Sequence, residues 1–213
     1  MPKSSGRKTI KTDQRVFTAG KTGSGKTYLW RHLLSNVQRL VVLDGKGTLS
    51  DWNLTDWQDR DGRRNLFKGE PVRLRVLAPL GDRDPSEFWD QVLWDCYEAG
   101  NVLIYCDELY AVNPPQKPAL PGLHAVYTRG RELQVGMISV TQRPTWIPLV
   151  VMSEADWFFC FRLQLQEDRA RVAAFMGPDV LTPPPDKYGF YYMESEDDKP
   201  KYVKRYTAGS FKV

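Results

Sequence analysis

The sequence predicts an α/β fold in which helices flank a mostly parallel sheet. Short apolar runs of strand length alternate along the chain with longer segments of helical periodicity, and this alternation is typical of β–α–β units. Two of the apolar runs end in glycine-rich or acidic sequence, as expected at the carboxyl edge of a parallel sheet, where ligands bind. The length of 213 residues suits a single domain.

The composition is that of a globular protein. Hydrophobic residues make up 41% of the chain and charged residues 26%, which excludes the disordered and fibrous classes. No apolar run is long enough to span a membrane, and the N-terminus lacks the apolar core of a secretory signal, so we expect a cytoplasmic protein with no transmembrane segment of its own. Cys96, Cys106 and Cys160 each lie in an apolar run, which predicts buried, reduced thiols.

The positive charge is concentrated near the N-terminus. The whole chain has a formal net charge of +4. Residues 1–15 account for that charge, with five basic side chains and one acidic one, which are Lys3, Arg7, Lys8, Lys11, Arg15 and Asp13. We therefore expect a basic N-terminal arm over residues 1–14 and a single domain over residues 15–213. The arm is either a contact for nucleic acid or a solvated tail.

The first half of the domain follows the alternation closely. A strand is expected at residues 16–19, a helix at 26–37 from its apolar spacing, and a buried strand at 40–43. Residues 51–70, with two tryptophans and scattered charges, predict only a loop and a short helix. Apolar residues alternate with arginines over 72–76, which predicts a strand with one polar face.

A long helix is expected over residues 85–99. Asp84 can cap it, Pro85 fits its first position, Glu87 completes a capping-box-like pattern, and Gly100 ends it. The remaining elements are expected to be strands at 102–106, 135–140 and 157–163, helices at 123–127 and 167–176, and a C-terminal β-hairpin of 188–193 and 202–206.

The segment GKTGSGKT at residues 20–27 matches the phosphate-loop pattern G-x-x-x-x-G-K-[ST]. Its glycines allow successive backbone N–H groups to face phosphate oxygens, and the helix that follows directs its positive N-terminus at them. Lys26 can reach the β- and γ-phosphates, and the Thr27 hydroxyl can bind Mg²⁺. We therefore predict ATP and Mg²⁺ as cofactors, bound by Gly20, Lys21, Thr22, Gly23, Ser24, Gly25, Lys26 and Thr27.

A second signal is the apolar run VLIYC, which ends in Asp107 and Glu108. At the carboxyl end of a parallel strand, Asp107 can hold Mg²⁺, and Glu108 can orient or deprotonate an attacking water. The alternative is a surface Asp-Glu pair at a strand end, which is common in isolation. Because a phosphotransferase that excludes water has no need of a water-activating glutamate, the second carboxylate favours a hydrolase.

Polar residues flank the predicted strand VGMISV. Gln142 follows it and is expected beside the two carboxylates, where its amide can contact the attacking water and a γ-phosphate oxygen. The alternative is a polar residue that caps the strand. Arg131 precedes the strand, and an arginine can stabilise transferring phosphoryl charge in a neighbouring subunit. Arg129 could fill the same role, and a solvated or salt-bridged arginine is the structural alternative.

Five segments, in this order, resemble the FtsK–HerA superfamily of DNA-pumping ATPases: GKTGSGKT, LVVLDGKG, VLIYCDE, GRELQVGMISVTQRP and FFCFRL. The resemblance covers roughly residues 15–177, and GR-x(9)-TQRP is its most specific part. It implies a RecA-like P-loop core that works as a hexameric ring and threads double-stranded DNA. The implied roles are nucleotide and Mg²⁺ binding by Lys26 and Thr27, Mg²⁺ binding by Asp107, general base for Glu108, sensor for Gln142 and trans-acting finger for Arg131.

The chain differs from several branches of the superfamily, and these differences limit the functions that we expect. The chain is too short for the barrel of the HerA helicases or the winged-helix part of FtsK, and we expect no membrane anchor of the kind found in conjugation coupling proteins. It most resembles the genome-packaging ATPases of tailless, internal-membrane double-stranded DNA viruses. This implies a motor that fills a preformed capsid, in the host cytoplasm or on the virion, docked on a capsid vertex or membrane protein.

Three alternatives remain open from the sequence. One is a cellular or plasmid DNA-transfer ATPase of the same superfamily. Another is a P-loop kinase, which Glu108 and Gln142 disfavour. The third is a nucleotide-gated assembly protein without motor activity.

Overall fold

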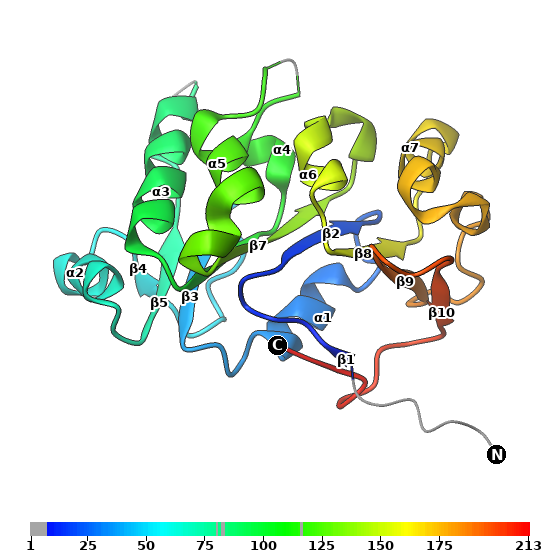
Figure 1. The fold of residues 1–213 in the computed structure, drawn as a ribbon, viewed down its shortest axis with the longest axis horizontal. Coiled ribbons are helices and arrows are strands. Elements are labelled where there is room, and N and C mark those ends of the chain that lie inside the picture. The colour runs from blue at the N-terminus through cyan, green and yellow to red at the C-terminus, as the bar shows by residue number, and fades with distance from the viewer. Residues whose placement is uncertain (1–7, 80, 82–83, 116) are drawn as a thin grey trace.

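The fold is that of a computed structural model, which describes residues 8–79, 81, 84–115 and 117–213 (Figure 1). Its main feature is a nine-stranded sheet in the order β10-β9-β8-β2-β7-β6-β3-β5-β4. All neighbouring pairs from β8 to β4 are parallel, and the pairs β8–β9 and β9–β10 are antiparallel. The predicted α/β fold with a mostly parallel sheet is confirmed.

The parallel strands include every central strand that the apolar runs predict. They are β2 (Arg15–Ala19), β3 (Arg39–Leu43), β4 (Thr55–Asp56), β5 (Val72–Val76), β6 (Val102–Cys106), β7 (Val135–Thr141) and β8 (Trp157–Phe161). β2, β3, β6, β7 and β8 are buried along their whole length, because helices cover both faces of a parallel sheet. β7 lies between β2, which precedes the phosphate loop, and β6, which precedes the two carboxylates.

Helices lie on both faces of this sheet (Figure 1). α1 (Lys26–Leu33) covers one face, while α3 (Ser86–Ala99), α5 (Pro121–Arg129) and α6 (Leu149–Ser153) cover the other. The short α4 (Leu109–Val112) follows β6, and α7 (Gln166–Met176) follows β8. α1 ends four residues before its expected end, and α3 begins at Ser86, whose backbone N–H and hydroxyl donate to the Asp84 carboxylate (3.3 and 2.6 Å).

The two faces of the sheet form two hydrophobic cores. Successive side chains along a strand point to opposite faces, so each strand contributes to both. In β3, for example, Leu40 and Val42 pack in the core of α1, whereas Val41 and Leu43 pack in the core of α3 and α5. The sheet therefore holds the carboxyl ends of its strands in a fixed register, which positions the loops that follow them.

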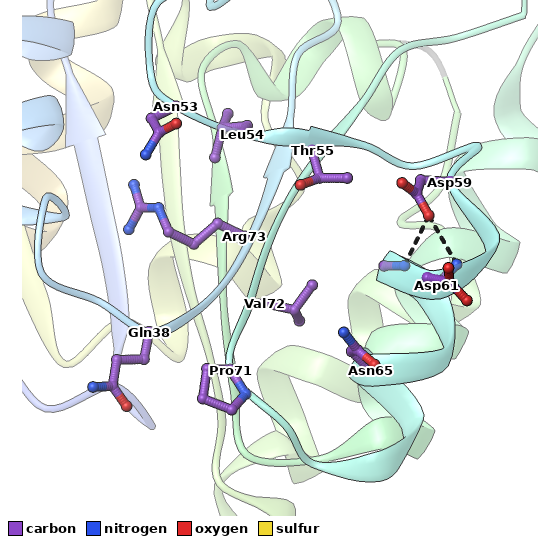
Figure 2. A pocket seen from close by; sticks show the side chains of 11 residues that line it. Gln38, Asn53, Leu54, Thr55, Asp59, Asp61, Asn65, Pro71, Val72 and Arg73 are labelled. Atoms are coloured by element: carbon purple, nitrogen blue, oxygen red, sulfur yellow. Dashed lines mark hydrogen bonds between the residues drawn. The ribbon is translucent and has the colours of Figure 1, made fainter.

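Residues 51–70 form edge strand β4 and helix α2 (Arg60–Lys68), of which the sequence predicts only the helix. Asp59 caps α2, because its carboxylate accepts hydrogen bonds from the backbone N–H groups of Asp61 (2.8 Å) and Gly62 (3.1 Å) (Figure 2). Together with β5, this segment lines a surface cavity of about 600 Å³ (Figure 2). The cavity lies at the edge of the sheet remote from β2, and no phosphate-loop residue lines it.

The two ends of the described chain pair with each other. β1 (Lys8–Thr9) and β11 (Phe211–Lys212) form a small parallel sheet of their own, and Ile10 and Phe211 are buried in the core of α1. Part of the expected basic arm therefore packs on the domain, while Lys3 and Arg7 lie outside the described residues. Arg15, which we counted with that basic segment, instead belongs to β2 and is buried beside Asp156 (Nε to Oδ2, 3.1 Å).

The C-terminal hairpin is confirmed as β9 (Phe190–Glu194) and β10 (Lys201–Val203), and β9 joins the main sheet through β8. The three cysteines are free and buried, as expected. Within the described part of the chain, no helix is both long and apolar enough to cross a membrane.

Candidate active site

The phosphate loop connects β2 to α1 and has the backbone shape that its sequence predicts. Gly23 and Gly25 adopt positive φ angles of 73° and 103°, a region that favours glycine. Gly20 has no room for a side chain, because a Cβ there would lie 2.6 Å from the Cβ of Phe161. The Lys26 ammonium lies inside the loop, where it donates to the carbonyl oxygens of Gly20 (2.5 Å) and Lys21 (2.9 Å).

Lys26 is the buried cation of the site, with 6% of its surface exposed. Burial lowers the pKa of Lys26 to about 8, and the charges of Glu108 and Asp107 oppose this shift. Because a cation removed from water is stabilised by a nearby anion, the position of Lys26 suits a phosphate group at the mouth of the loop.

Thr27 and Asp107 bring together two oxygen ligands. The Thr27 hydroxyl donates to Asp107 Oδ1 (3.1 Å), which also accepts from the Tyr105 hydroxyl (2.7 Å). Hydroxyl and carboxylate oxygens are the donors that Mg²⁺ prefers, and Mg²⁺ needs few protein ligands where phosphates supply others. Among the described residues, no group of three or more His, Cys, Asp or Glu side chains could hold a metal ion. The two oxygen donors of Thr27 and Asp107 fit Mg²⁺ that binds together with a nucleotide, because phosphates supply its other ligands.

Glu108 and Gln142 lie next to each other at the carboxyl ends of β6 and β7. Glu108 is only 1% exposed, and its Oε1 accepts from the backbone N–H of Gln142 (3.1 Å). The Gln142 side chain in turn accepts from the hydroxyl of Thr22 in the phosphate loop (2.6 Å). Gln142 thus lies beside Glu108, where its place in the sequence predicts it, and it also contacts the phosphate loop.

The site also contains a charged residue that the motifs do not predict, Lys46. Its ammonium lies 3.0 Å from Glu108 Oε2 and 5.6 Å from the centre of the Tyr110 ring. Lys46 belongs to the segment LVVLDGKG, whose strand β3 ends at the same edge of the sheet as β6. The signal was present in the sequence, because a lysine between two glycines follows directly on the acidic end of a buried parallel strand.

Arg131 lies at the amino ends of the strands, opposite the end at which the phosphate loop lies. It belongs to a short 3₁₀ helix (Gly130–Leu133) before β7 and forms an ion pair with Asp156, which precedes β8. The seven residues of β7 span about 23 Å at roughly 3.3 Å per residue. Arg131 therefore cannot reach phosphates bound in its own chain. The guanidinium of Arg129 lies nearby, over the Tyr97 ring at 5.8 Å from its centre.

Two adjoining cavities open at the phosphate loop. The first, of about 420 Å³, is lined by loop residues together with the charged and polar residues Lys46, Asp107, Glu108 and Gln142. The second, of about 670 Å³, is lined by Phe161 and residues 205–208. Gly25, Tyr28 and Tyr188 border both cavities. A charged cavity that continues into an aromatic one matches the two halves of a nucleotide.

A curated relative identifies the family. Over 172 residues the sequence is 34% identical to the DNA packaging ATPase P9 of Enterobacteria phage PRD1. The aligned region covers 78% of this chain and 72% of P9. The chain belongs to the packaging ATPase family of P9. This membership confirms the resemblance to viral genome-packaging ATPases that the motifs predict. No family model matches the sequence.

Solved structures share the packaging ATPase fold. The genome packaging NTPase B204 of Sulfolobus turreted icosahedral virus 2, in complex with AMPPCP, has a TM-score of 0.75 and 18% identity, over 92% of this chain and all of that one. The pCW3 conjugation coupling protein TcpA has a TM-score of 0.60 and 12% identity, over 94% of this chain and 60% of that one. At these identities the likeness shows the fold, including the P-loop core with its mostly parallel sheet.

Proposed function

We propose that the chain is an ATP-hydrolysing motor that moves double-stranded DNA into a preformed viral capsid. The observation that carries the proposal is the convergence of Lys26, Thr27, Asp107, Glu108 and Gln142 on one cavity in a member of the packaging ATPase family. The relative P9 is a DNA packaging ATPase, and B204 is a genome packaging NTPase whose structure holds an ATP analogue.

The five converging residues each have a role in this proposal. The N–H groups of the phosphate loop and the Lys26 ammonium bind the β- and γ-phosphates. Thr27 and Asp107 would hold Mg²⁺, which neutralises charge on the phosphates when it is bound. Glu108 accepts a proton from the attacking water, and Gln142 orients that water against the γ-phosphate.

The aromatic cavity supports adenine as the base. Tyr28 and Tyr188 are 69% and 44% exposed, respectively, so their rings are accessible to a ligand. Their rings border the passage between the two cavities and offer faces on which a purine can stack. The proposed ATP thus spans both cavities, with its phosphates on the loop.

The alternative functions are less well supported. The likeness to TcpA concerns the fold, whereas the relationship to P9 extends to the sequence, which favours packaging over conjugative transfer. A kinase would not need Glu108 and Gln142 side by side at the phosphate loop. A nucleotide-gated assembly protein would bind ATP but would show no acceleration by DNA.

Duplex DNA is expected to accelerate ATP turnover, which tests the motor directly. DNA binding should depend weakly on sequence and steeply on salt, because the contacts go to the phosphate backbone. The measurements are ATPase rates with and without duplex DNA, and DNA affinity over a salt series. A turnover rate that duplex DNA leaves unchanged would contradict the proposed motor.

The same salt series tests the basic arm that we propose for residues 1–14. A variant that lacks residues 1–7 loses Lys3 and Arg7 but keeps the paired strand β1. The slope of log affinity against log salt should become shallower, because fewer counterions are released from the DNA. An unchanged slope would show that these residues are a solvated tail.

We also propose that the active unit is a homo-oligomeric ring, most simply a hexamer, docked on a capsid vertex or membrane protein in the host cytoplasm or on the virion. Within one chain, Arg131 and the phosphate loop lie at opposite edges of the sheet. A finger role for Arg131 therefore requires a neighbouring subunit. Arg131 is 54% exposed in its side chain, so it is accessible to such a neighbour.

Mixing two inactive variants should restore activity. Arg131→Ala is expected to bind ATP normally and hydrolyse it poorly, because an arginine finger stabilises charge that develops in the transition state. In a mixture with Lys26→Ala, some interfaces combine an intact phosphate loop with an intact Arg131, so ATPase activity should partly recover. Absence of recovery would contradict the finger role of Arg131 and leave it with a structural role as the partner of Asp156. The double variant R129A/R131A controls for the case in which Arg129 takes over the finger role.

A further inference from the structure

The cavity contains an ion pair that engages the proposed general base. The Lys46 ammonium lies 3.0 Å from Oε2 of Glu108, and the backbone N–H of Gln142 donates a hydrogen bond to Oε1. Glu108 is 1% exposed, so water reaches its carboxylate only from the cavity side. A carboxylate can accept a proton from water only through an oxygen that the water can approach. Both oxygens of Glu108 are engaged by protein donors in this arrangement.

The backbone around Lys46 is held firmly in place. Asp44 is buried and accepts hydrogen bonds from the backbone N–H groups of Thr48 (3.0 Å) and Leu49 (2.8 Å) and from the guanidinium of Arg75 (2.7 Å). Gly45 packs so closely on α4 that a Cβ would lie 2.7 Å from the Cβ of Ala111. These contacts fix the base of the Lys46 side chain at the carboxyl edge of β3.

The side chain of Lys46, in contrast, has freedom to move. The Lys46 side chain is 34% exposed, whereas that of its partner Glu108 is 1% exposed. A lysine also has a flexible four-carbon stem that ends in a compact charge. Its ammonium lies in the same cavity as Lys26 and Thr27 of the phosphate loop. A γ-phosphate in that cavity is an anion that can compete with Glu108 for Lys46, and ADP lacks this anion.

We propose that Lys46 is a positioning residue that exchanges its partner from Glu108 to the γ-phosphate when ATP binds. The exchange frees Oε2 of Glu108 to accept a proton from the attacking water only when a γ-phosphate is present. ATP, but not ADP, thereby prepares the base. The inference rests on the proposed ATPase function and assigns to this chain a contact that discriminates ATP from ADP.

A purely structural role for Lys46 makes a different prediction. Buried carboxylates need a compensating charge, and Lys46 could provide only that. The variant Glu108→Gln separates the two roles, because it removes the charge that needs compensation and also blocks hydrolysis, so that equilibrium binding of ATP can be measured. In this background a structural Lys46 has no remaining function, whereas a Lys46 that contacts the γ-phosphate still has one.

The experiment compares ATP and ADP affinity in three variants of the Glu108→Gln protein, measured by isothermal titration with Mg²⁺ present. Adding Lys46→Met should weaken ATP binding by roughly 10-fold or more, the loss of one charge-assisted contact, and leave ADP affinity unchanged. Lys46→Arg should restore most of the ATP preference. Lys68→Met removes an exposed lysine from the last turn of α2 and should change neither affinity.

Thermal unfolding without nucleotide tests the ion pair that Lys46 forms with Glu108 before ATP binds. Lys46→Met should lower the melting temperature in the wild-type background, where it leaves Glu108 buried without its partner, and much less in the Glu108→Gln background. Equal losses in both backgrounds would overturn the ion pair. An unchanged ratio of ATP to ADP affinity in the Glu108→Gln, Lys46→Met protein would overturn the γ-phosphate contact. If the Glu108→Gln protein bound neither nucleotide, the proposed function itself would fail.

Discussion

Replacing Glu108 by glutamine is expected to reduce ATP turnover by roughly 10²-fold or more, because general-base catalysis contributes about that much. The amide keeps the size of the side chain and still accepts the hydrogen bond that the Gln142 N–H donates to Oε1 in the structure. ATP should therefore remain bound to the variant. Single-turnover hydrolysis, measured alongside ATP affinity, separates the lost chemical step from any change in binding.

The matched control for this variant is Glu98→Gln. Glu98 is exposed near the end of α3, on the face of the sheet opposite α1, so its loss of charge should leave turnover unchanged. Normal turnover by the Glu108→Gln protein would show that the base lies elsewhere. It would also remove the main argument that this site hydrolyses ATP instead of transferring its phosphate.

Replacing Lys26 by alanine is expected to abolish measurable ATP binding, with affinity reduced by roughly 10²-fold or more through the loss of charge-assisted contacts to two phosphates. The side chain also donates to the carbonyl oxygens of Gly20 and Lys21, so the loop loses two internal hydrogen bonds. We expect the fold to survive, because the two hydrophobic cores do not depend on this lysine.

Circular dichroism and thermal unfolding establish whether the Lys26→Ala protein is folded, and titration with ATP then measures its affinity. Lys68→Ala serves as the control, because Lys68 is an exposed lysine of α2 outside both nucleotide cavities. Wild-type affinity in a folded Lys26→Ala protein would contradict the assignment of the phosphate loop.

The sequence predicts the central fold because the strands of a parallel sheet are buried on both faces and appear as continuous apolar runs. It places Asp107, Glu108 and Gln142 together for a related reason. Parallel strands end at one edge, so a polar residue directly after an apolar run is placed by topology alone. The order of the strands supplies the rest, since β7 lies between β2 and β6 and brings Gln142 between the loop and the carboxylates.

Other features depend on contacts between residues far apart in the sequence. The pairing of β1 with β11 joins two-residue strands from opposite ends of the chain, and so short a segment carries no periodicity of its own. β4 likewise consists of two exposed residues, which pair with β5. The contact of Lys46 with Glu108 joins residues 62 positions apart. The sequence places Lys46 at the carboxyl end of β3 but does not specify Glu108 as its partner, because a lysine between glycines also occurs in solvated turns.

The distance between Arg131 and the phosphate loop restricts how copies of this chain can assemble. The two features lie at opposite ends of the strands of one sheet, so under the proposed finger role an interface between copies must bring two separate parts of the surface together. A two-fold dimer meets this requirement only if one self-complementary patch includes both features, whereas a head-to-tail interface meets it with two separate patches. Head-to-tail contacts leave one unpaired surface at each end of an open chain of subunits. When the subunits close into a ring, both of these surfaces are paired. In the proposed ring, every active site is complete only when the assembly is closed, with every subunit both donor and recipient.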